Sequence, residues 1–259
     1  MTAADAAIEA VATTDSLLIA VDFDGTLSPL VDDPMAARMT TGARAVLDDL
    51  VTLPRTVVAL VSGRSLGHLR EIAEHTDDSR IWLAGSHGVQ FWIPGAGIEE
   101  SDHDGDARSL RDRLQQEMSR RAADLPGVRI ETKEYGLGVH TRTADAETAR
   151  AARALADDLV AAEAPGWRRR TGHDILEFSF RHEGKDSAVS HLRERVGATA
   201  VLFAGDDVTD EDALRSLDPG DLGIRVGAGE TAATLRVDDI DALVAVLEDI
   251  ARLRRAHTD

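Results

Sequence analysis

The stretch LLIAVDFDGT, residues 17–26, decides the fold of this chain. Its first five residues are apolar without a break, which predicts a short strand buried on both faces, as in a parallel sheet covered by helices. Two carboxylates, Asp22 and Asp24, follow directly. Side chains at positions i and i+2 of an extended segment share one face, so both acids should point into one small site. Like charges at the end of a buried strand are costly, and they therefore indicate a bound cation or a chemical role.

The rest of the chain alternates short β-rich runs with helical stretches rich in Ala, Leu and Arg. This alternation predicts an α/β fold with a Rossmann-like, mostly parallel sheet. Residues 89–180 differ, because their strand patterns pair locally around two helical patterns and Phe91–Gly97 has the composition of a hairpin or loop. We therefore expect a core made of residues 1–88 and 181–259, with an α/β module inserted at 89–180.

Composition limits the classes of partner. The formal net charge of −18 argues against a nucleic-acid backbone or an anionic membrane as a partner. The chain has no cysteine, which excludes disulfides and thiolate chemistry. No apolar stretch approaches the ~20 residues of a membrane span, and the first residues are acidic rather than basic. The expectation is a cytoplasmic enzyme.

Polar, glycine-containing loops follow three of the predicted core strands, whose carboxyl ends should meet at one edge of the sheet. Carboxylate oxygens there suit Mg²⁺, and a lysine with backbone N–H groups suits a phosphate. One carboxylate can attack phosphorus to give an aspartyl-phosphate, while a second protonates the leaving oxygen and then activates water. The residues concerned are Asp22, Asp24, Ser62, Gly63, Lys185, Asp206, Asp207 and Asp210.

These segments resemble, in their order along the chain, the four motifs of the haloacid-dehalogenase superfamily. The segments are DFDGT at 22–26, Ser62, Lys185 and GDDVTDE at 205–211. Dehalogenases of that superfamily lack the second acid of the first motif, whereas its phosphatases and phosphomutases have it. Asp24 therefore indicates phosphoryl transfer.

Nearly the whole chain more closely resembles the trehalose-6-phosphate phosphatase family. The shared features are SGR at 62–64, GSHG at 85–88, Lys133 followed by VHTR at 139–142, and Glu177. The inserted module would then be that family's α/β cap, of the C2 type. Three positions depart from the family's usual pattern, which has Glu, Gly and a basic residue where this chain has Gln90, Asp186 and Ser179.

The resemblance implies a role for each matching residue. Asp22 is the nucleophile and Asp24 the general acid/base. Mg²⁺ is held by Asp22, the Asp24 carbonyl and Asp206, with Asp207 and Asp210 in or just behind the ligand shell. The phosphoryl group is bound by Ser62, Gly63 and Lys185, and the candidate sugar contacts are Arg64, His87, Lys133, Arg142 and Glu177. The cluster Arg168–Arg170 is interpreted as a solvated face.

The function implied is Mg²⁺-dependent hydrolysis of trehalose 6-phosphate to trehalose and phosphate. The partner is then a small-molecule sugar phosphate, and a trehalose-6-phosphate synthase is a candidate functional partner. Three alternatives stay open. The first is a phosphatase for another sugar phosphate, such as sucrose phosphate or mannosyl-phosphoglycerate, and the second is a phosphomutase. The third is a non-catalytic domain that binds sugar phosphate to regulate a synthase.

Overall fold

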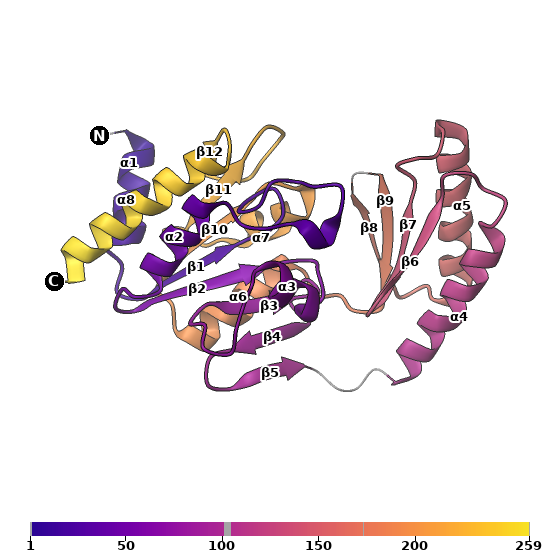
Figure 1. Ribbon diagram of the computed structural model, residues 1–259, viewed down its shortest axis with the longest axis horizontal. Helices are drawn as coiled ribbons and strands as arrows, with labels where there is room; N and C mark the ends of the chain where they lie inside the picture. Colours follow the sequence, from indigo (N-terminus) through magenta and orange to yellow (C-terminus); the bar gives the residue numbers. More distant parts are fainter. Residues whose placement is uncertain (1, 101–104, 173, 259) are drawn as a thin grey trace. The chain divides into compact units, whose positions relative to one another are not determined.

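The computed structural model divides into two compact units (Figure 1). The core unit consists of Met1–Glu100 with Glu183–Asp259, and the inserted unit is Ser101–His182. The first boundary lies at residue 100, whereas the sequence placed it at residue 88. The structure describes residues 2–100, 105–172 and 174–258.

The core contains one eight-stranded sheet in the order β12-β11-β10-β1-β2-β3-β4-β5. Neighbouring strands from β12 to β3 are parallel, which confirms the predicted α/β class, and β4 and β5 extend the sheet in antiparallel fashion. The strands are β1 (Leu17–Val21), β2 (Thr56–Val61), β3 (Trp82–Gly85), β4 (Gln90–Ile93), β5 (Gly97–Glu100), β10 (Ala200–Gly205), β11 (Leu222–Val226) and β12 (Leu235–Val237).

Strands β4 and β5 explain why the boundary differs from the sequence-based one. Both faces of β4 are apolar: Phe91 and Ile93 join the apolar cluster on one side of the sheet, and Trp92 joins the cluster on the other. Trp92 also pairs with Leu83 of β3. A strand that is apolar on both faces is best buried in a sheet that helices cover on both faces. The core sheet is covered in this way, so the β4-β5 hairpin belongs to the core.

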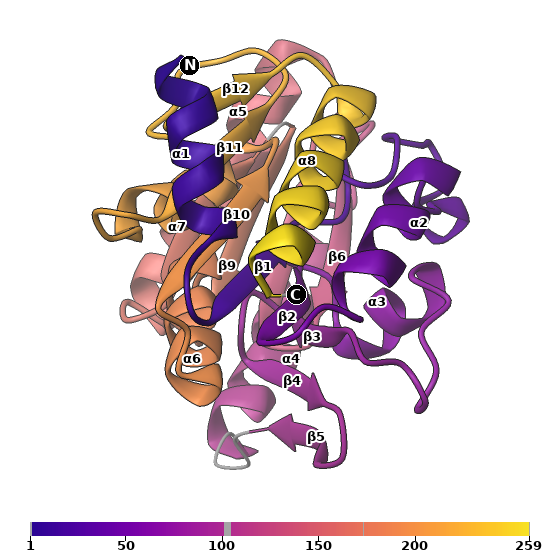
Figure 2. The same ribbon diagram turned by 90° about the vertical axis from the view of Figure 1, so that its left-hand side faces the viewer.

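Helices cover both faces of the core sheet (Figure 2). Leu17, Ile19 and Val21 of β1 pack into the cluster beneath α1, α2, α3 and α8, while Leu18 and Ala20 pack into the cluster beneath α6 and α7. This division confirms that the LLIAV stretch is buried on both faces. The helices are α1 (Ala3–Ala12), α2 (Thr41–Leu50), α3 (Leu66–Ile72), α6 (Lys185–Val196), α7 (Glu211–Ser216) and α8 (Ile240–Thr258), with short 3₁₀ turns at Pro34–Ala36 and Val208–Asp210.

The inserted unit is a four-stranded antiparallel sheet, β6-β7-β9-β8, with two helices. Leu137, Val139, Leu176 and Phe178 pack with Leu114 and Met118 and with the Ala-rich side of the second helix. The opposite face of the sheet is polar, as period-2 alternation requires. The elements are α4 (Gly105–Arg121), β6 (Arg129–Lys133), β7 (Gly136–His140), α5 (Ala146–Glu163), β8 (Arg168–Gly172) and β9 (Ile175–Ser179).

Within the described residues, no helix combines the length and the apolar character needed to cross a membrane.

A buried arginine near the end of α8 joins three distant parts of the core. Arg254 is 0% exposed, and its guanidinium donates to the Thr56 hydroxyl at 2.5 Å. It also donates to the carbonyls of Ala12 and Thr14, at 3.1 and 2.9 Å, and to that of Arg55 at 2.6 Å. These oxygens belong to the end of α1 and to the segments that lead into β1 and β2. Burial lowers the pKa of Arg254, and the nearby Arg55 adds to this effect.

We predict that Arg254→Met destabilises the chain by about 3 kcal/mol, because several buried and part-buried oxygens lose a hydrogen bond at once. The measurement is the free energy of unfolding in urea. Arg255→Met is the matched control, because Arg255 is the next residue of the same helix and makes an exposed ion pair with Asp49. The control should cost under about 1 kcal/mol. Equal losses for the two variants would contradict the role given to Arg254.

Candidate active site

The central strands end together at one edge of the core sheet. Val21, the last residue of β1, pairs with Ala204 of β10 and with Leu60 of β2. The segments that follow these three strands begin with Asp22, Asp206 and Ser62, so the parallel register brings them to the same edge. This is the edge at which the sequence predicted the site.

Three carboxylates gather here. Oxygens of Asp22, Asp206 and Asp210 lie within 4.8 Å of one another. Asp22 and Asp210 are buried, with 4% and 0% of their surface exposed. The Thr26 hydroxyl lies 3.4 Å from Asp22 Oδ2 and 3.2 Å from Asp206 Oδ1 and can donate to either. Asp207 lies outside this cluster and is exposed to solvent.

Lys185 is the cation inside the cluster. Its Nζ donates to Asp22 Oδ1 and to Asp210 Oδ1, both at 2.6 Å, and only 4% of the lysine is exposed. Burial by itself lowers the pKa of Lys185, but the two carboxylates outweigh burial and raise it above the ordinary value. Lys185 therefore stays protonated and serves as a fixed positive charge.

The cluster carries more negative than positive charge. Burial raises the pKa of Asp22; Lys185 opposes that rise, while Asp210 and Asp206 add to it. Burial and Asp210 likewise raise the pKa of Asp206 to about 6. When all three acids are ionised, one ammonium leaves two negative charges uncompensated. Hard oxygen donors with this excess charge fit a divalent cation such as Mg²⁺.

Asp210 has fewer free oxygens to coordinate a metal than Asp22 and Asp206, the other two carboxylates of the cluster. One of its oxygens accepts from Lys185, and the other accepts the backbone N–H groups of Asp206 and Asp207 at 3.0 and 2.9 Å. Asp210 is therefore suited to shape the loop, while Asp22 and Asp206 keep oxygens that could face a metal.

Gly25 allows the Asp206 carboxylate to approach the turn after β1. Its φ of +79° lies in the left-handed region, and a Cβ at this position would lie 2.1 Å from Asp206 Oδ2. Only glycine satisfies both conditions. The glycine that follows the two acids is thus required by the approach of the second acidic loop.

Asp24 has a partner that the sequence did not indicate. Arg64 donates from Nε to Asp24 Oδ2 at 2.6 Å and from Nη2 to Asp24 Oδ1 at 2.7 Å. The sequence suggested Arg64 as a sugar contact and Asp24 as the proton-transfer residue. The structure joins them in a two-point ion pair, the strongest geometry open to an arginine and a carboxylate.

The loops after β2 and β3 pack on each other. The backbone N–H of His87 donates to the Ser62 carbonyl at 2.9 Å, and a Cβ on Gly63 would lie 2.6 Å from the His87 ring. The Gln90 side-chain oxygen accepts from the Leu66 N–H and from the Ser86 hydroxyl, both at 3.1 Å. Gln90, a departure from the family pattern, therefore serves here as a hydrogen-bond acceptor that holds this turn.

In the inserted unit, two of the three candidate sugar contacts lie together. Lys133 Nζ is 2.5 Å from Glu177 Oε1, on the polar face of the four-stranded sheet. Arg142 lies two residues beyond the end of β7, in a turn, and is exposed. His140, which lies in the quoted VHTR segment but was given no role, is 2.5 Å from Glu131 on the same polar face. Strand alternation alone could have identified it.

The three consecutive arginines do not form a single face. Arg168 pairs with Ser179, and Arg170 pairs with Glu177. These two arginines therefore lie on the polar face, whereas Arg169 points to the other side and pairs with Asp157 at 2.6 Å.

Comparison with known proteins agrees with this geometry. The model of the trehalose-phosphatase family matches residues 20–241, which include both parts of the core and the inserted unit. The chain belongs to this family.

Individual relatives of the family support the assignment. The trehalose-phosphate phosphatase of Mycobacterium ulcerans (strain Agy99) is 32% identical over 238 residues, which are 90% of this chain and 58% of the relative. The chain thus spans about six-tenths of the length of that relative.

Solved structures share the fold. The C. albicans trehalose-6-phosphate phosphatase C-terminal domain is 22% identical, has a TM-score of 0.82, and matches over 97% of this chain and 98% of that one. A haloacid dehalogenase-like hydrolase from Bacteroides thetaiotaomicron is 15% identical, has a TM-score of 0.66, and matches over 91% and 100%. These structures show the shared fold, and the family model confirms the predicted family.

We predict that Gly63→Ala lowers the rate of phosphate release from a phosphate ester by about 100-fold, because the methyl group must displace His87 or shift the Ser62 turn. Gly67→Ala is the matched control, since a Cβ at position 67 of α3 has no heavy atom within 4 Å. The control should keep full activity. A Gly63→Ala variant with unchanged activity would show that the close packing of these loops is not needed.

Proposed function

We propose that this chain is a Mg²⁺-dependent phosphatase that hydrolyses trehalose 6-phosphate to trehalose and inorganic phosphate. The observation that carries the proposal is the position of Asp22. It lies in a buried carboxylate cluster beside a protonated lysine, in a chain of the trehalose-phosphatase family. The names of the relatives support the choice of substrate.

Mg²⁺ would be held by Asp22 and Asp206, with the Asp24 carbonyl as a further oxygen ligand and Asp210 behind them. When bound, the cation supplies positive charge that lowers the pKa of Asp22 and attracts phosphate oxygens. Thr26 can donate its one hydroxyl proton to either carboxylate, since both lie within hydrogen-bond distance.

Asp22 performs the first step. Its carboxylate oxygen attacks phosphorus, the bond from phosphorus to the sugar oxygen breaks, and Asp24 gives the leaving oxygen a proton. Lys185 and the Ser62-Gly63 turn bind the phosphoryl oxygens. In the second step Asp24 takes a proton from water, which attacks the phosphorus of the aspartyl-phosphate and releases phosphate and free Asp22. The two-point ion pair with Arg64 fits the ionised form of Asp24, which takes the proton from water in the second step; the protonated form that acts in the first step lacks the charge that Arg64 pairs with.

The inserted unit serves as a cap that contacts the sugar. Lys133 and Glu177 offer a donor and an acceptor side by side, and such a pair can bind neighbouring sugar hydroxyls. Arg142 is a further candidate. Arg64 and His87 would provide contacts from the core.

The direct test measures inorganic phosphate released from trehalose 6-phosphate. Asp22→Asn should lower the rate by about a thousandfold or more, because the amide cannot act as the nucleophile. Asp207→Asn, at an exposed position outside the carboxylate cluster, is the control and should reduce the rate by less than about tenfold. If Asp22→Asn retains full activity, the nucleophile is assigned wrongly.

A panel of sugar phosphates tests the substrate. Trehalose 6-phosphate should give the highest kcat/KM, ahead of sucrose 6-phosphate, mannosyl-phosphoglycerate and glucose 6-phosphate. A preference for another of these would contradict the substrate assignment. Isomerisation of a sugar phosphate without phosphate release would indicate a mutase.

Removal of the metal gives a separate prediction. Treatment with EDTA should abolish phosphate release, and added Mg²⁺ should restore it, because the cluster needs a cation to keep its carboxylates ionised. Beryllium fluoride with Mg²⁺ should inhibit the chain as a mimic of the phosphorylated aspartate. Full activity in EDTA, or insensitivity to beryllium fluoride, would contradict the mechanism.

A further inference from the structure

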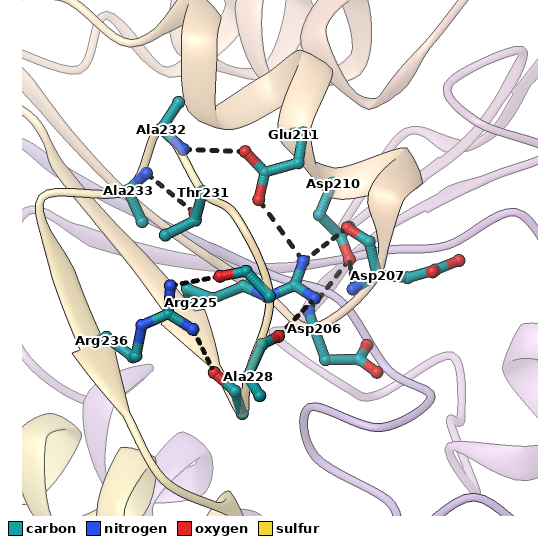
Figure 3. A network of polar contacts seen from close by, with 12 residues as sticks. Asp206, Asp207, Asp210, Glu211, Arg225, Ala228, Thr231, Ala232, Ala233 and Arg236 are labelled. Carbon is teal, nitrogen blue, oxygen red and sulfur yellow. Dashed lines mark hydrogen bonds and ion pairs between the residues drawn. The ribbon is translucent and has the colours of Figure 1, made fainter.

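An arginine in a buried strand contacts the acidic loop (Figure 3). Arg225 lies in β11, whose five residues are all buried, and only 8% of it is exposed. Its Nη1 donates to the backbone carbonyl of Asp207 at 2.9 Å, and its Nη2 donates to the carbonyl of Ala228 at 3.1 Å. The charged group thus holds the acidic loop that follows β10 and the loop that follows β11.

Glu211, the first residue of α7, also contacts Arg225. It is 4% exposed, and its Oε1 lies 3.4 Å from Arg225 Nη1. Its Oε2 accepts the backbone N–H of Ala232 at 2.8 Å. Glu211 and Arg225 balance each other in charge, so the pair adds no net charge beside the carboxylate cluster.

The two sides of the Asp206-Asp207 backbone are therefore held by different groups. Asp210 accepts both N–H groups, and Arg225 donates to the Asp207 carbonyl. The segment that carries the Asp206 carboxylate is fixed from both directions. Gly227 and Ala228, on the loop that Arg225 also holds, line with Gly25 and Asp206 a hollow of about 420 Å³.

We propose that Arg225, supported by Glu211, is a positioning residue that sets the place of the Asp206 carboxylate and thereby the Mg²⁺ affinity of the site. This inference rests on the proposed metal site. A buried ion pair contributes little net stability compared with apolar residues of the same size. What this ion pair contributes is a hydrogen bond from Arg225 to the Asp207 carbonyl, next to Asp206. The position of a metal ligand depends on the groups that hold its backbone.

Arg236 provides a matched comparison. It lies opposite Arg225 in the register of β11 and β12, and it donates to the carbonyls of Gly227 and Gly229. Arg236 therefore holds the same loop after β11 but is exposed. Removing Arg236 therefore disturbs the loop after β11 but leaves the contact between Arg225 and the acidic loop after β10 in place.

The experiment measures Mg²⁺ binding to the whole chain by isothermal titration calorimetry, with the melting temperature recorded in EDTA. Arg225→Met should weaken Mg²⁺ binding by about 10- to 100-fold. Arg225→Lys, which keeps the positive charge and one donor nitrogen in place of two, should lose less, and Arg236→Met should stay within about twofold of the parent chain. In activity assays, saturating Mg²⁺ should restore most of the kcat of Arg225→Lys while KM for the sugar phosphate stays unchanged.

Several outcomes would overturn the inference. One is a folded Arg225→Met variant with unchanged Mg²⁺ affinity, and another is an equal loss of affinity in Arg236→Met. If Arg225→Met does not fold, Arg225→Lys and Glu211→Gln decide, and unchanged affinity in both would also overturn it. Absence of Mg²⁺ binding by the parent chain would overturn it together with the metal site. A parent chain that binds Mg²⁺ but does not hydrolyse trehalose 6-phosphate would disprove the proposed function alone.

Discussion

The ammonium of Lys185 lies between two buried carboxylates, 2.6 Å from an oxygen of Asp22 and 2.6 Å from one of Asp210. Carboxylates at such burial would be neutral or displaced without a compensating charge. Lys185 is the first residue of α6, Asp22 directly follows β1 and Asp210 is the N-cap of α7, so the interaction joins three core elements that are distant along the chain. The position of the acidic loop, the approach of Asp206 to Gly25 and the room for a cation all depend on this contact.

Much of the core could be predicted from the sequence, because the patterns that specify its strands lie within short stretches of the chain. The bounds of β1 follow from an uninterrupted apolar run, and the candidate site follows from the rule that parallel strands end at one edge. Strands β4 and β5 were assigned to the inserted module, because only the partner strand shows which sheet a hairpin joins.

Pairs of side chains were harder to predict than elements. No local pattern shows that Arg64 would hold Asp24, or that Arg225 would reach the carbonyl of Asp207, since each contact joins residues from different strand ends. An arginine within the buried LGIRV strand was the available signal. A charged residue in such a strand has to be paired, and the carboxyl-end loops are the places where a partner can lie. Alternation along β8 carried similar information about Arg168 and Arg170.

The contacts of Arg254 have a consequence for how the chain folds during synthesis. The central strand β1 pairs with β10, some 180 residues later, and Arg254 of α8 donates to oxygens around the starts of β1 and β2. A ribosome therefore releases most of the core before the core can close. The apolar cluster of the inserted unit, by contrast, forms entirely between residues 110 and 178. One edge of β1 therefore stays unpaired on the nascent chain until β10 has been synthesised, and an unpaired strand edge is prone to aggregation during that interval.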